Sequence, residues 1–418
     1  MLRFPAPAGD GEHRLHGATG PELLCPAGDL ERLEMALGYG ADAVYLAGKQ
    51  YGLRASAAGF EEGDMVSAAA LCHRLGAKMY VAVNALPHEA ELSALPAFLE
   101  SAAEAGADAF IIADLGVMAL AKRHAPKVPL HVSTPFGVVN SETATMLCDL
   151  GAKRVVLARE LSLEEIASIR AHTPGELELE AFVHGAMCVS FSGRCILSNY
   201  LTGRDGNAGA CAQPCRWKYH RVEEKRPGRY YEITEDGGTH ILNAEDLCMI
   251  EHIPELSRSG IGSLKIEGRM KSAYYAAVTA YAYRGAIDDY LAGRPCDPAW
   301  VRECEMVSHR RYSTGFYFGA PGQYYDEAMY FSGAEVCAVV ERCDGRGEAI
   351  LTQRNKFSLG DMVELITPGQ RPFRFPVTDL RDGEGTAIDS APHAMMELRM
   401  SLPTKVRRLS ILRRIKET

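Results

Sequence analysis

Residues 106–113 read GADAFIIA, which is a glycine and a small residue followed by a short apolar run. The same pattern recurs in GADAVYL (40–46), GAKMYVAV (76–83) and GAKRVVLA (151–158). Glycine suits the position just after a helix, and the run that follows suits a parallel strand buried on both faces. Alanine-rich stretches with helical spacing, such as MVSAAALCHRL (65–75), lie between the runs. The repeat therefore predicts alternating strands and helices.

Four further runs extend this pattern to eight strands. They are ELLCPAG (22–28), PLHVST (129–134), LELEAFVHG (177–185) and GSLKIEG (262–268). Eight parallel strands that alternate with helices are the number and order found in a TIM-like (β/α)8 barrel. The alternative is an open doubly wound sheet, which usually has fewer strands, and no dinucleotide-type glycine-rich turn follows the first run. The sequence favours the barrel within the α/β class.

The predicted barrel occupies residues 21–330, after a loose tail at residues 1–20. A cysteine-rich insertion at 186–250 interrupts it after the seventh strand. This insertion is expected on the C-terminal face, where barrel enzymes carry their active sites. Residues 331–418 alternate like short strands separated by turn residues, so they predict a small β-barrel-like domain.

Composition excludes several classes of protein. The chain has 418 residues, 24% of them charged, and a net charge of −9, which excludes wholesale disorder and a uniformly basic nucleic-acid coat. No apolar run reaches the roughly 18 residues of a membrane-spanning helix. The N-terminus also lacks the apolar core of a signal peptide. We expect a cytoplasmic protein with no membrane partner.

Four cysteines are concentrated in the insertion, at Cys188, Cys195, Cys211 and Cys215. Four thiolates complete either a zinc site or an iron–sulfur cluster. Structural zinc sites usually place paired ligands about two to four residues apart, and only Cys211 and Cys215 do so. The irregular spacing therefore favours an iron–sulfur cluster over zinc. The remaining alternative is four thiols that serve packing.

Polar residues at the C-terminal ends of barrel strands are candidates for chemistry. The predicted catalytic residues are Glu180, His184 and Glu267. The strand period of two places Glu180 and His184 on one face, and an imidazole can donate a proton near neutral pH. The alternative for His184 is that it anchors a loop. The predicted substrate-binding residues are Asn84, Arg159, Arg194, Trp217, Lys265 and Arg269.

Two segments suggest an RNA partner. RWKYHRVEEKRPGR (216–229) interleaves basic residues with Trp217 and Tyr219, which offer stacking faces for a splayed-out base. KVRRLSILRR (405–414) is a second basic stretch. Against an acidic whole, such patches are typical of localised phosphate contacts. The alternatives are a solvated charged loop and a basic tail.

Five of these motifs resemble those of the U32, or collagenase-like, peptidase family. They are ELLCPAG, GADAVYL, EAFVHGAMC (180–188), SGRC (192–195) and SLKIEGR (263–269). The resemblance runs from about Pro21 through the C-terminal domain and is closest to the family's prephenate-dependent tRNA-hydroxylating members.

That resemblance implies a barrel with a 4Fe-4S cluster on Cys188, Cys195, Cys211 and Cys215. It also implies hydroxylation of the wobble uridine in the anticodon region of tRNA, with prephenate as the hydroxyl source. A guanidinium grips carboxylates bidentately, so Arg194 and Arg269 are candidates to bind this small carboxylate co-substrate.

The chain departs from the family pattern at two positions expected at the barrel mouth. Pro135 replaces a glutamine, and Gly59 replaces an asparagine before an aromatic residue. Cys248 is not expected to be a cluster ligand, because NAEDLCMIEHIPEL (243–256) looks like the start of an amphipathic helix with Cys248 in its core.

Two other functions stay open. One is the peptidase activity in the family's name, although the sequence has no G-x-S-x-G elbow, and Leu92 breaks an H-E-x-x-H pattern. The other is a cluster-stabilised RNA-binding or assembly protein without chemistry of its own.

Overall fold

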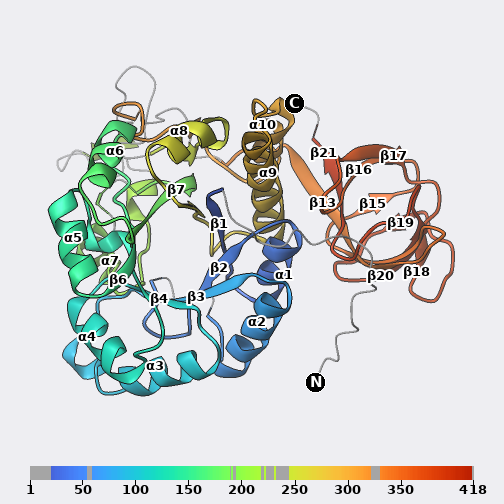
Figure 1. Cartoon of the computed structure of the whole chain (residues 1–418). Coiled ribbons are helices and arrows are strands. Elements are labelled where there is room, and N and C mark those ends of the chain that lie inside the picture. The colour runs from blue at the N-terminus through green and yellow to red at the C-terminus, as the bar shows by residue number, and fades with distance from the viewer. Residues whose placement is uncertain are drawn as a thin grey trace.

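The computed structural model describes residues 20–53, 59–188, 190–191, 194–217, 221–222, 230–231, 244–321 and 330–416. Two units are visible: a ring of strands surrounded by helices, and a smaller β unit beside it (Figure 1). Among the described residues, no helix combines the length and the apolar character needed to span a bilayer.

Eight parallel strands form the ring. They are β1 (Glu22–Pro26), β2 (Ala43–Leu46), β3 (Lys78–Val83), β4 (Ala109–Ile112), β5 (Leu130–Val132), β6 (Ala152–Val156), β7 (Glu178–Ala186) and β11 (Ser263–Ile266). Neighbours in chain order pair with one another, and β11 pairs with both β7 and β1. All eight predicted strands are present and the ring is closed, so the predicted TIM-like barrel is confirmed.

Helices join these strands and cover the outside of the ring. They are α1 (Leu30–Gly38), α2 (Glu62–Arg74), α3 (Leu95–Glu104), α4 (Leu115–His124), α5 (Ser141–Asp149), α6 (Leu163–Ala171), α8 (Ile253–Arg258), α9 (Ala273–Leu291) and α10 (Pro298–Glu305). Asp29, Asp114 and Asn140 begin three of them, because each side chain accepts a hydrogen bond from a backbone N–H of the first turn. Such a cap stabilises a helix by about 1 kcal/mol.

Alternate strand residues serve two separate cores. Leu23, Val44 and Phe110 belong to the large cluster between strands and helices, whereas Tyr45 and Tyr80 belong to a small cluster inside the ring. Most other members of the inner cluster are alanines. These small side chains leave room inside the barrel for the tyrosines and for charged groups.

The insertion after β7 contains α7 (Leu197–Thr202), short 3-10 turns and β8 (Arg221–Val222), β9 (Tyr230–Tyr231) and β10 (Asp246–Cys248). β10 pairs antiparallel with the end of β7 and parallel with β12 (Tyr312–Ser313). The prediction of a helix start around Cys248 is therefore wrong. β7 is long enough to offer its edge to another strand, and this tertiary pairing overrides the local helical pattern. The helix begins only at Ile253.

The C-terminal unit is all-β, as predicted. Its seven-stranded antiparallel sheet has the order β17 (Phe373–Pro376), β16 (Met362–Ile366), β21 (Ile411–Ile415), β13 (Ala334–Cys343), β14 (Glu348–Gln353), β20 (Glu397–Ser401), β18 (Arg381–Asp382). β15 (Phe357–Ser358) and β19 (Ser390–Ala391) form a separate pair. The unit has its own buried apolar core.

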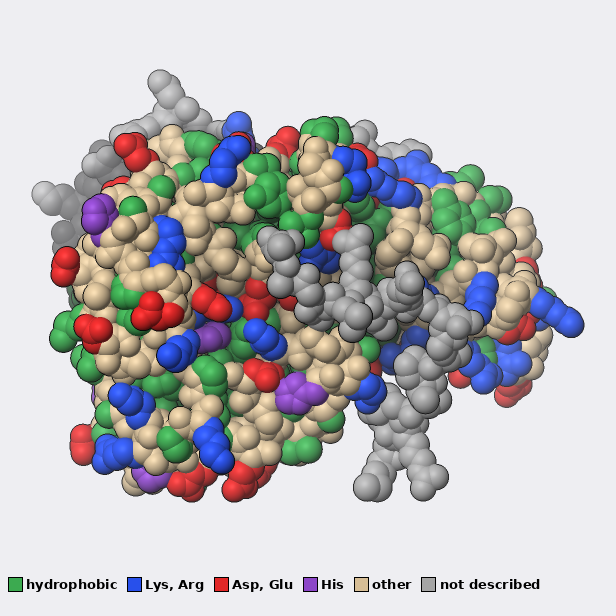
Figure 2. Space-filling view, viewed as in Figure 1, with side chains coloured by type: hydrophobic (Ala, Val, Ile, Leu, Met, Phe, Trp, Pro, Cys, Tyr) green, Lys and Arg blue, Asp and Glu red, His purple; other side chains and the backbone are tan. Residues whose placement is uncertain are grey.

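The two units are joined by a buried cation. The side chain of Arg413 on β21 is 0% exposed and pairs with Glu303 of α10 at 2.6 Å and with Glu364 of β16 at 2.5 Å. Figure 1 shows β13 and β21 beside α9 and α10. On the face of the molecule in Figure 2, basic and acidic side chains are interspersed over the barrel, so the negative net charge is not concentrated there.

Candidate active site at the barrel mouth

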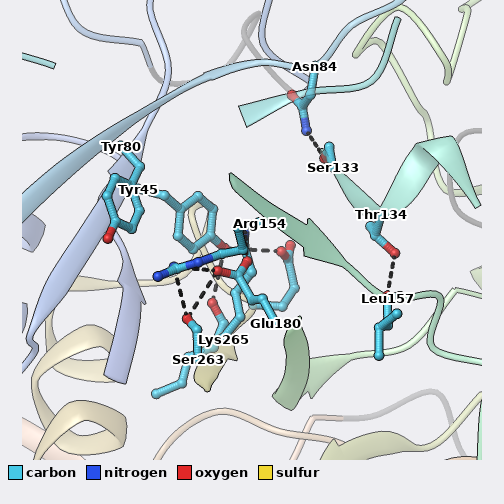
Figure 3. A network of polar contacts seen from close by, with 12 residues as sticks. Tyr45, Tyr80, Asn84, Ser133, Thr134, Arg154, Leu157, Glu180, Ser263 and Lys265 are labelled. Carbon is cyan, nitrogen blue, oxygen red and sulfur yellow. Dashed lines mark hydrogen bonds and ion pairs between the residues drawn. The ribbon is translucent and has the colours of Figure 1, made fainter. Parts of the chain in front are cut away.

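A buried ionic network occupies the inside of the barrel (Figure 3). Glu180 on β7 accepts hydrogen bonds from Lys265 Nζ at 2.8 Å, and from Arg154 Nη1 and Ser263 Oγ at 3.0 Å each. The Glu180 side chain is only 1% exposed. Arg154 also binds Glu22 at 2.6 Å. Charged side chains of four strands, β1, β6, β7 and β11, thus form one network across the barrel.

This network fixes the charge of Glu180. Burial opposes ionisation of the carboxyl, but Lys265 and Arg154 outweigh burial and hold the pKa of Glu180 at about 2. Burial also lowers the pKa of Lys265, and Glu180 opposes that change. A carboxylate held ionised in this way cannot donate a proton near neutral pH. Its placement favours a structural role over the predicted catalytic one.

Glu267 lies one layer nearer the mouth and is half-buried. Tyr45 OH lies 3.2 Å from Glu267 Oε2 and 3.0 Å from the Ile266 carbonyl, and can donate to either. Lys265 Nζ lies 4.6 Å from the centre of the Tyr45 ring and 5.5 Å from that of Phe182. Of the three predicted catalytic residues, Glu267 is the one that lies at the mouth with access to solvent.

Arg159 and Arg269, two predicted substrate-binding residues, lie at the mouth just after the ends of β6 and β11. The Arg159 guanidinium stacks on Phe182 at 3.9 Å, and Nη1 donates to the Ala186 carbonyl at 2.9 Å. Its Nε is buried and has no hydrogen-bond partner among the described residues. Arg269 donates to the Leu53 carbonyl. A buried N–H without a partner is costly, so Arg159 is suited to a ligand that supplies an acceptor.

Asn84, another predicted substrate-binding residue, lies just beyond the end of β3. Its Oδ1 accepts from the Leu53 backbone N–H at 3.1 Å, and its Nδ2 donates to Ser133 Oγ at 3.1 Å. Pro135, the first departure from the family pattern, follows this serine in a buried 3-10 turn (Thr134–Phe136). Asn84 therefore holds two loops of the mouth together.

The insertion lies at this same end of the barrel. Arg194 Nη2 donates to the Phe136 carbonyl after β5 at 3.0 Å. The Leu86 N–H after β3 donates to the Asn207 carbonyl at 3.4 Å. Cys188 is two residues beyond the last residue of β7. The insertion thus contacts loops of the C-terminal face, where the sequence placed it.

Cys188, Cys195, Cys211 and Cys215 are all at least partly exposed. Thiols in such positions do not serve core packing. The Gln213 N–H donates to Cys211 Sγ at 3.4 Å, a contact of the kind that tunes thiolates in iron–sulfur sites. Among the described residues, the four do not gather as tightly as ligands of a single ion would. Four cysteine thiolates are the usual donor set of a 4Fe-4S cluster, so the residue types present fit that group.

His184 does not share a face with Glu180, so that prediction is wrong. The pairing of β7 with β11 shifts by one residue between Phe182 and His184. His184 consequently packs against Tyr275 and Tyr283 of α9, outside the ring. The signal in the sequence is Gly185, which has a φ of +105° and whose Cβ would lie 2.5 Å from the Glu267 carbonyl oxygen. Only glycine permits that close crossing of strands.

The two predicted RNA-binding segments differ in how much of each is described and in whether their charges are paired within the fold. Trp217 is 43% exposed at the end of a 3-10 turn (Pro214–Arg216), while residues 218–220 and 223–229 lie outside the described residues. The C-terminal basic stretch is not a free tail. Arg408 pairs with Glu34 and Arg414 with Glu335, each through an ion pair, so these charges are used within the fold.

Sequence reasoning missed Arg154, which organises the interior network. It lies in GAKRVVLA, and a charge within an otherwise apolar strand was the available signal. His131, also missed, is buried beside Tyr80, with ring centres 4.8 Å apart. Burial, followed by the charge of Arg154, lowers the pKa of His131 well below its ordinary value, so this histidine is neutral.

Residues 28–327 match Peptidase family U32, and residues 333–413 match the Peptidase family U32 C-terminal domain. The chain belongs to peptidase family U32. The resemblance seen in the sequence motifs is therefore confirmed, and both units of the structure fall within the family.

Several U32 relatives have names that describe RNA hydroxylation. The chain is 38% identical to the tRNA hydroxylation protein P of Escherichia coli (strain K12), over 89% of this chain and 91% of that protein. It is 36% identical to the tRNA hydroxylation protein P1 of Bacillus subtilis (strain 168), over 94% of each. It is 35% identical to the 23S rRNA 5-hydroxycytidine C2501 synthase of Escherichia coli (strain K12), over 65% of this chain and 40% of that enzyme.

Proposed function

We propose that this U32 protein is an RNA-modifying enzyme that hydroxylates tRNA. More specifically, we propose that it converts the wobble uridine to 5-hydroxyuridine, with prephenate as the hydroxyl source. The observation that carries the proposal is Arg159 at the barrel mouth, whose buried Nε has no hydrogen-bond partner in the part of the chain that the structure describes. The cysteine-bearing insertion contacts loops of the same end of the barrel. The names of the full-length relatives support the same class of reaction.

The mouth is suited to a small carboxylate. Of the predicted residues there, Arg159, Arg194 and Arg269 are cationic and Glu267 is the one carboxylate. A guanidinium offers a planar pair of donors that matches a carboxylate. Phe182 stacks under Arg159 at 3.9 Å and fixes the plane of its donors. We assign Arg159 to the carboxylate of the hydroxyl donor, with Arg269 as a second cationic candidate at the mouth.

Other residues would hold the RNA base and accept the proton that it loses. Trp217 is exposed in the same insertion as the cysteines and offers a face on which an unstacked base can lie. Glu267 is half-buried, and its Oε2 lies within hydrogen-bond distance of Tyr45 OH. Replacement of the hydrogen on C5 of uracil releases a proton, and Glu267 is our candidate to accept it.

Cys188, Cys195, Cys211 and Cys215 would hold the 4Fe-4S cluster. When bound, such a cluster supplies one-electron redox chemistry at a potential set by hydrogen bonds and exposure. The chain's own contribution is to anchor the insertion to loops of the mouth through the contacts of Arg194 and Asn207.

The test is nucleoside mass spectrometry on tRNA from a strain that lacks the gene. We expect 5-hydroxyuridine and its derivatives to disappear, and to return with the wild-type gene but not with Arg159→Met. Arg258→Met is the matched control, because Arg258 is an exposed arginine on α8, and it should restore the nucleoside fully.

Three outcomes would overturn the proposal. Unchanged tRNA nucleosides in the deletion strain would show that the protein does not hydroxylate tRNA. Peptide hydrolysis that survives Cys211→Ser/Cys215→Ser would favour a peptidase. RNA binding with no nucleoside lost would favour an assembly protein without chemistry.

A further inference from the structure

A second group of potential metal ligands lies outside the ring of strands and includes none of Cys188, Cys195, Cys211 and Cys215. His184 of β7, Cys248 of β10 and Cys304 of α10 place one ligand atom each within 4.8 Å of one another. These three residues come from elements far apart in the chain. The proposed hydroxylation uses none of them.

The chemistry of the three atoms matches one kind of ion. A zinc ion binds thiolate sulfur at ~2.3 Å and imidazole nitrogen at ~2.0 Å, so ligands of one ion lie within about 4.6 Å of each other. Two thiolates would balance the charge of Zn²⁺, which suits a site that is largely buried. Two cysteines and a histidine are also a known ligand set of zinc enzymes.

His184 supplies an independent sign of a missing partner. Its ring is 1% exposed, and Nδ1 has no hydrogen-bond partner among the described residues. Nε2 lies 3.4 Å from Tyr312 OH, at the limit of a hydrogen bond. Tyr312 OH meanwhile makes a shorter bond, 2.8 Å, to the Cys304 carbonyl. A buried imidazole is rarely left with an unused nitrogen.

The surrounding contacts hold these residues in place. Tyr283 OH donates to the Val183 carbonyl at 2.7 Å, which fixes β7 against α9. Asp246, two residues before Cys248, pairs with Arg310 at 2.9 Å, and both side chains are 2% exposed. A site whose ligands are fixed by other contacts binds a metal without a large ordering cost.

We propose that His184, Cys248 and Cys304 bind one zinc ion, distinct from the cluster assigned to the insertion. On binding, Zn²⁺ replaces the two thiol protons, which are released to solvent, and the neutral imidazole donates a lone pair. No electron is transferred. The ion ties β7 and β10 to α10, and His184 accepts through its carbonyl from the Glu267 N–H at 2.9 Å. The zinc therefore braces β7, the strand that leads to Cys188, and the segment that carries Glu267.

The experiment measures zinc and iron per chain by mass spectrometry of the full-length protein, purified without oxygen and reconstituted with Zn²⁺. We expect about one zinc in the wild type, and at least a fivefold loss of zinc in Cys304→Ser with the iron content unchanged. Cys337→Ser is the matched control: Cys337 is also fully buried but lies on β13, and its substitution should leave zinc unchanged. Cys211→Ser/Cys215→Ser should lower iron and spare zinc, which separates this site from the cluster.

A second measurement covers the case in which Cys304→Ser does not fold. Co²⁺ in place of zinc should give the wild-type protein a near-ultraviolet thiolate-to-metal absorption band, and folded His184→Asn should shift or weaken it. Wild-type protein without zinc after reconstitution would overturn the proposal. Zinc retained in Cys304→Ser would overturn it too, as would a Cys248–Cys304 disulfide in protein kept free of oxygen.

Discussion

Lys265 Nζ lies 2.8 Å from Glu180 Oε1 in the interior of the barrel. The other oxygen of that carboxylate accepts from Arg154 at 3.0 Å. Barrel interiors are ordinarily filled by branched apolar side chains, whereas this one carries paired charges below its mouth. The pairing holds Lys265 under the Tyr45 ring, on the strand that leads to Glu267. The interior network thus fixes the position of the strand that leads to Glu267 in the candidate active site.

Removal of the central carboxylate should destabilise the fold. Glu180→Gln leaves Arg154 and Lys265 with less compensation in a buried site, and breaking a buried pair costs about 3–5 kcal/mol. Urea unfolding followed by circular dichroism measures this loss. Glu178→Gln is the control, because Glu178 also pairs with Arg154 but is 58% exposed. Its effect should stay below about 1 kcal/mol; equal losses in both variants would contradict the assignment.

The same carboxylate predicts a pH dependence. The pKa of Glu180 is about 2 in the folded protein and 4.5 ordinarily, so the folded state favours the ionised form. The resulting stability is fully present above pH 4.5 and is lost as the pH falls toward 2. The unfolding free energy of the wild type should therefore fall more steeply than that of Glu180→Gln across this window. Parallel curves for the two proteins would show that Glu180 is not held ionised.

Arg413 should control the attachment of the C-terminal unit. Arg413→Met leaves Glu303 and Glu364 buried without their shared cation, and we expect a loss of about 3–5 kcal/mol. Differential scanning calorimetry and limited proteolysis between the two units measure it. Arg414→Met removes a neighbouring arginine that is 40% exposed, and should cost less than about 1 kcal/mol. A cooperative unfolding transition unchanged by Arg413→Met would show that the cation does not join the units.

Arg159→Lys should show whether donor binding at the mouth needs only a positive charge or also the planar guanidinium. The lysine keeps the positive charge but lacks the planar fork. A lost hydrogen bond to a charged group is worth about 1.5–3 kcal/mol, so the prephenate concentration that supports half-maximal tRNA hydroxylation should rise roughly 10- to 100-fold. Arg258→Lys should leave it unchanged. If Arg159→Lys needs the same prephenate concentration as the wild type for half-maximal hydroxylation, Arg159 does not bind the donor.

Trp217→Ala should weaken tRNA binding by about 1–3 kcal/mol, the value of one stacked base. Trp217→Phe keeps an aromatic face and should retain most of the affinity. Fluorescence anisotropy with labelled tRNA at one fixed salt concentration makes the comparison, since salt alone changes such affinities strongly. Equal affinity of the alanine variant and the wild type would place the RNA elsewhere.

The sequence predicted the barrel because a parallel strand buried on both faces is a short apolar run between helices, and eight such runs were distinct. It also located the mouth residues Asn84, Arg159 and Glu267, since polar side chains after a buried run mark a strand end. The face of His184 could not be predicted, because it depends on a register shift between β7 and β11. The strand at Cys248 was missed for a related reason: its partner is the edge of β7, far away in the chain.

We propose that the cysteine-bearing insertion at the barrel mouth is required for tRNA hydroxylation. The most direct measurement is the 5-hydroxyuridine content of tRNA in a deletion strain that expresses Cys211→Ser/Cys215→Ser, beside one that expresses the wild type at the same protein level. We predict that the hydroxylated nucleoside is absent with the double variant and present with the wild type. Equal amounts in the two strains would show that the insertion cysteines are not required for the reaction.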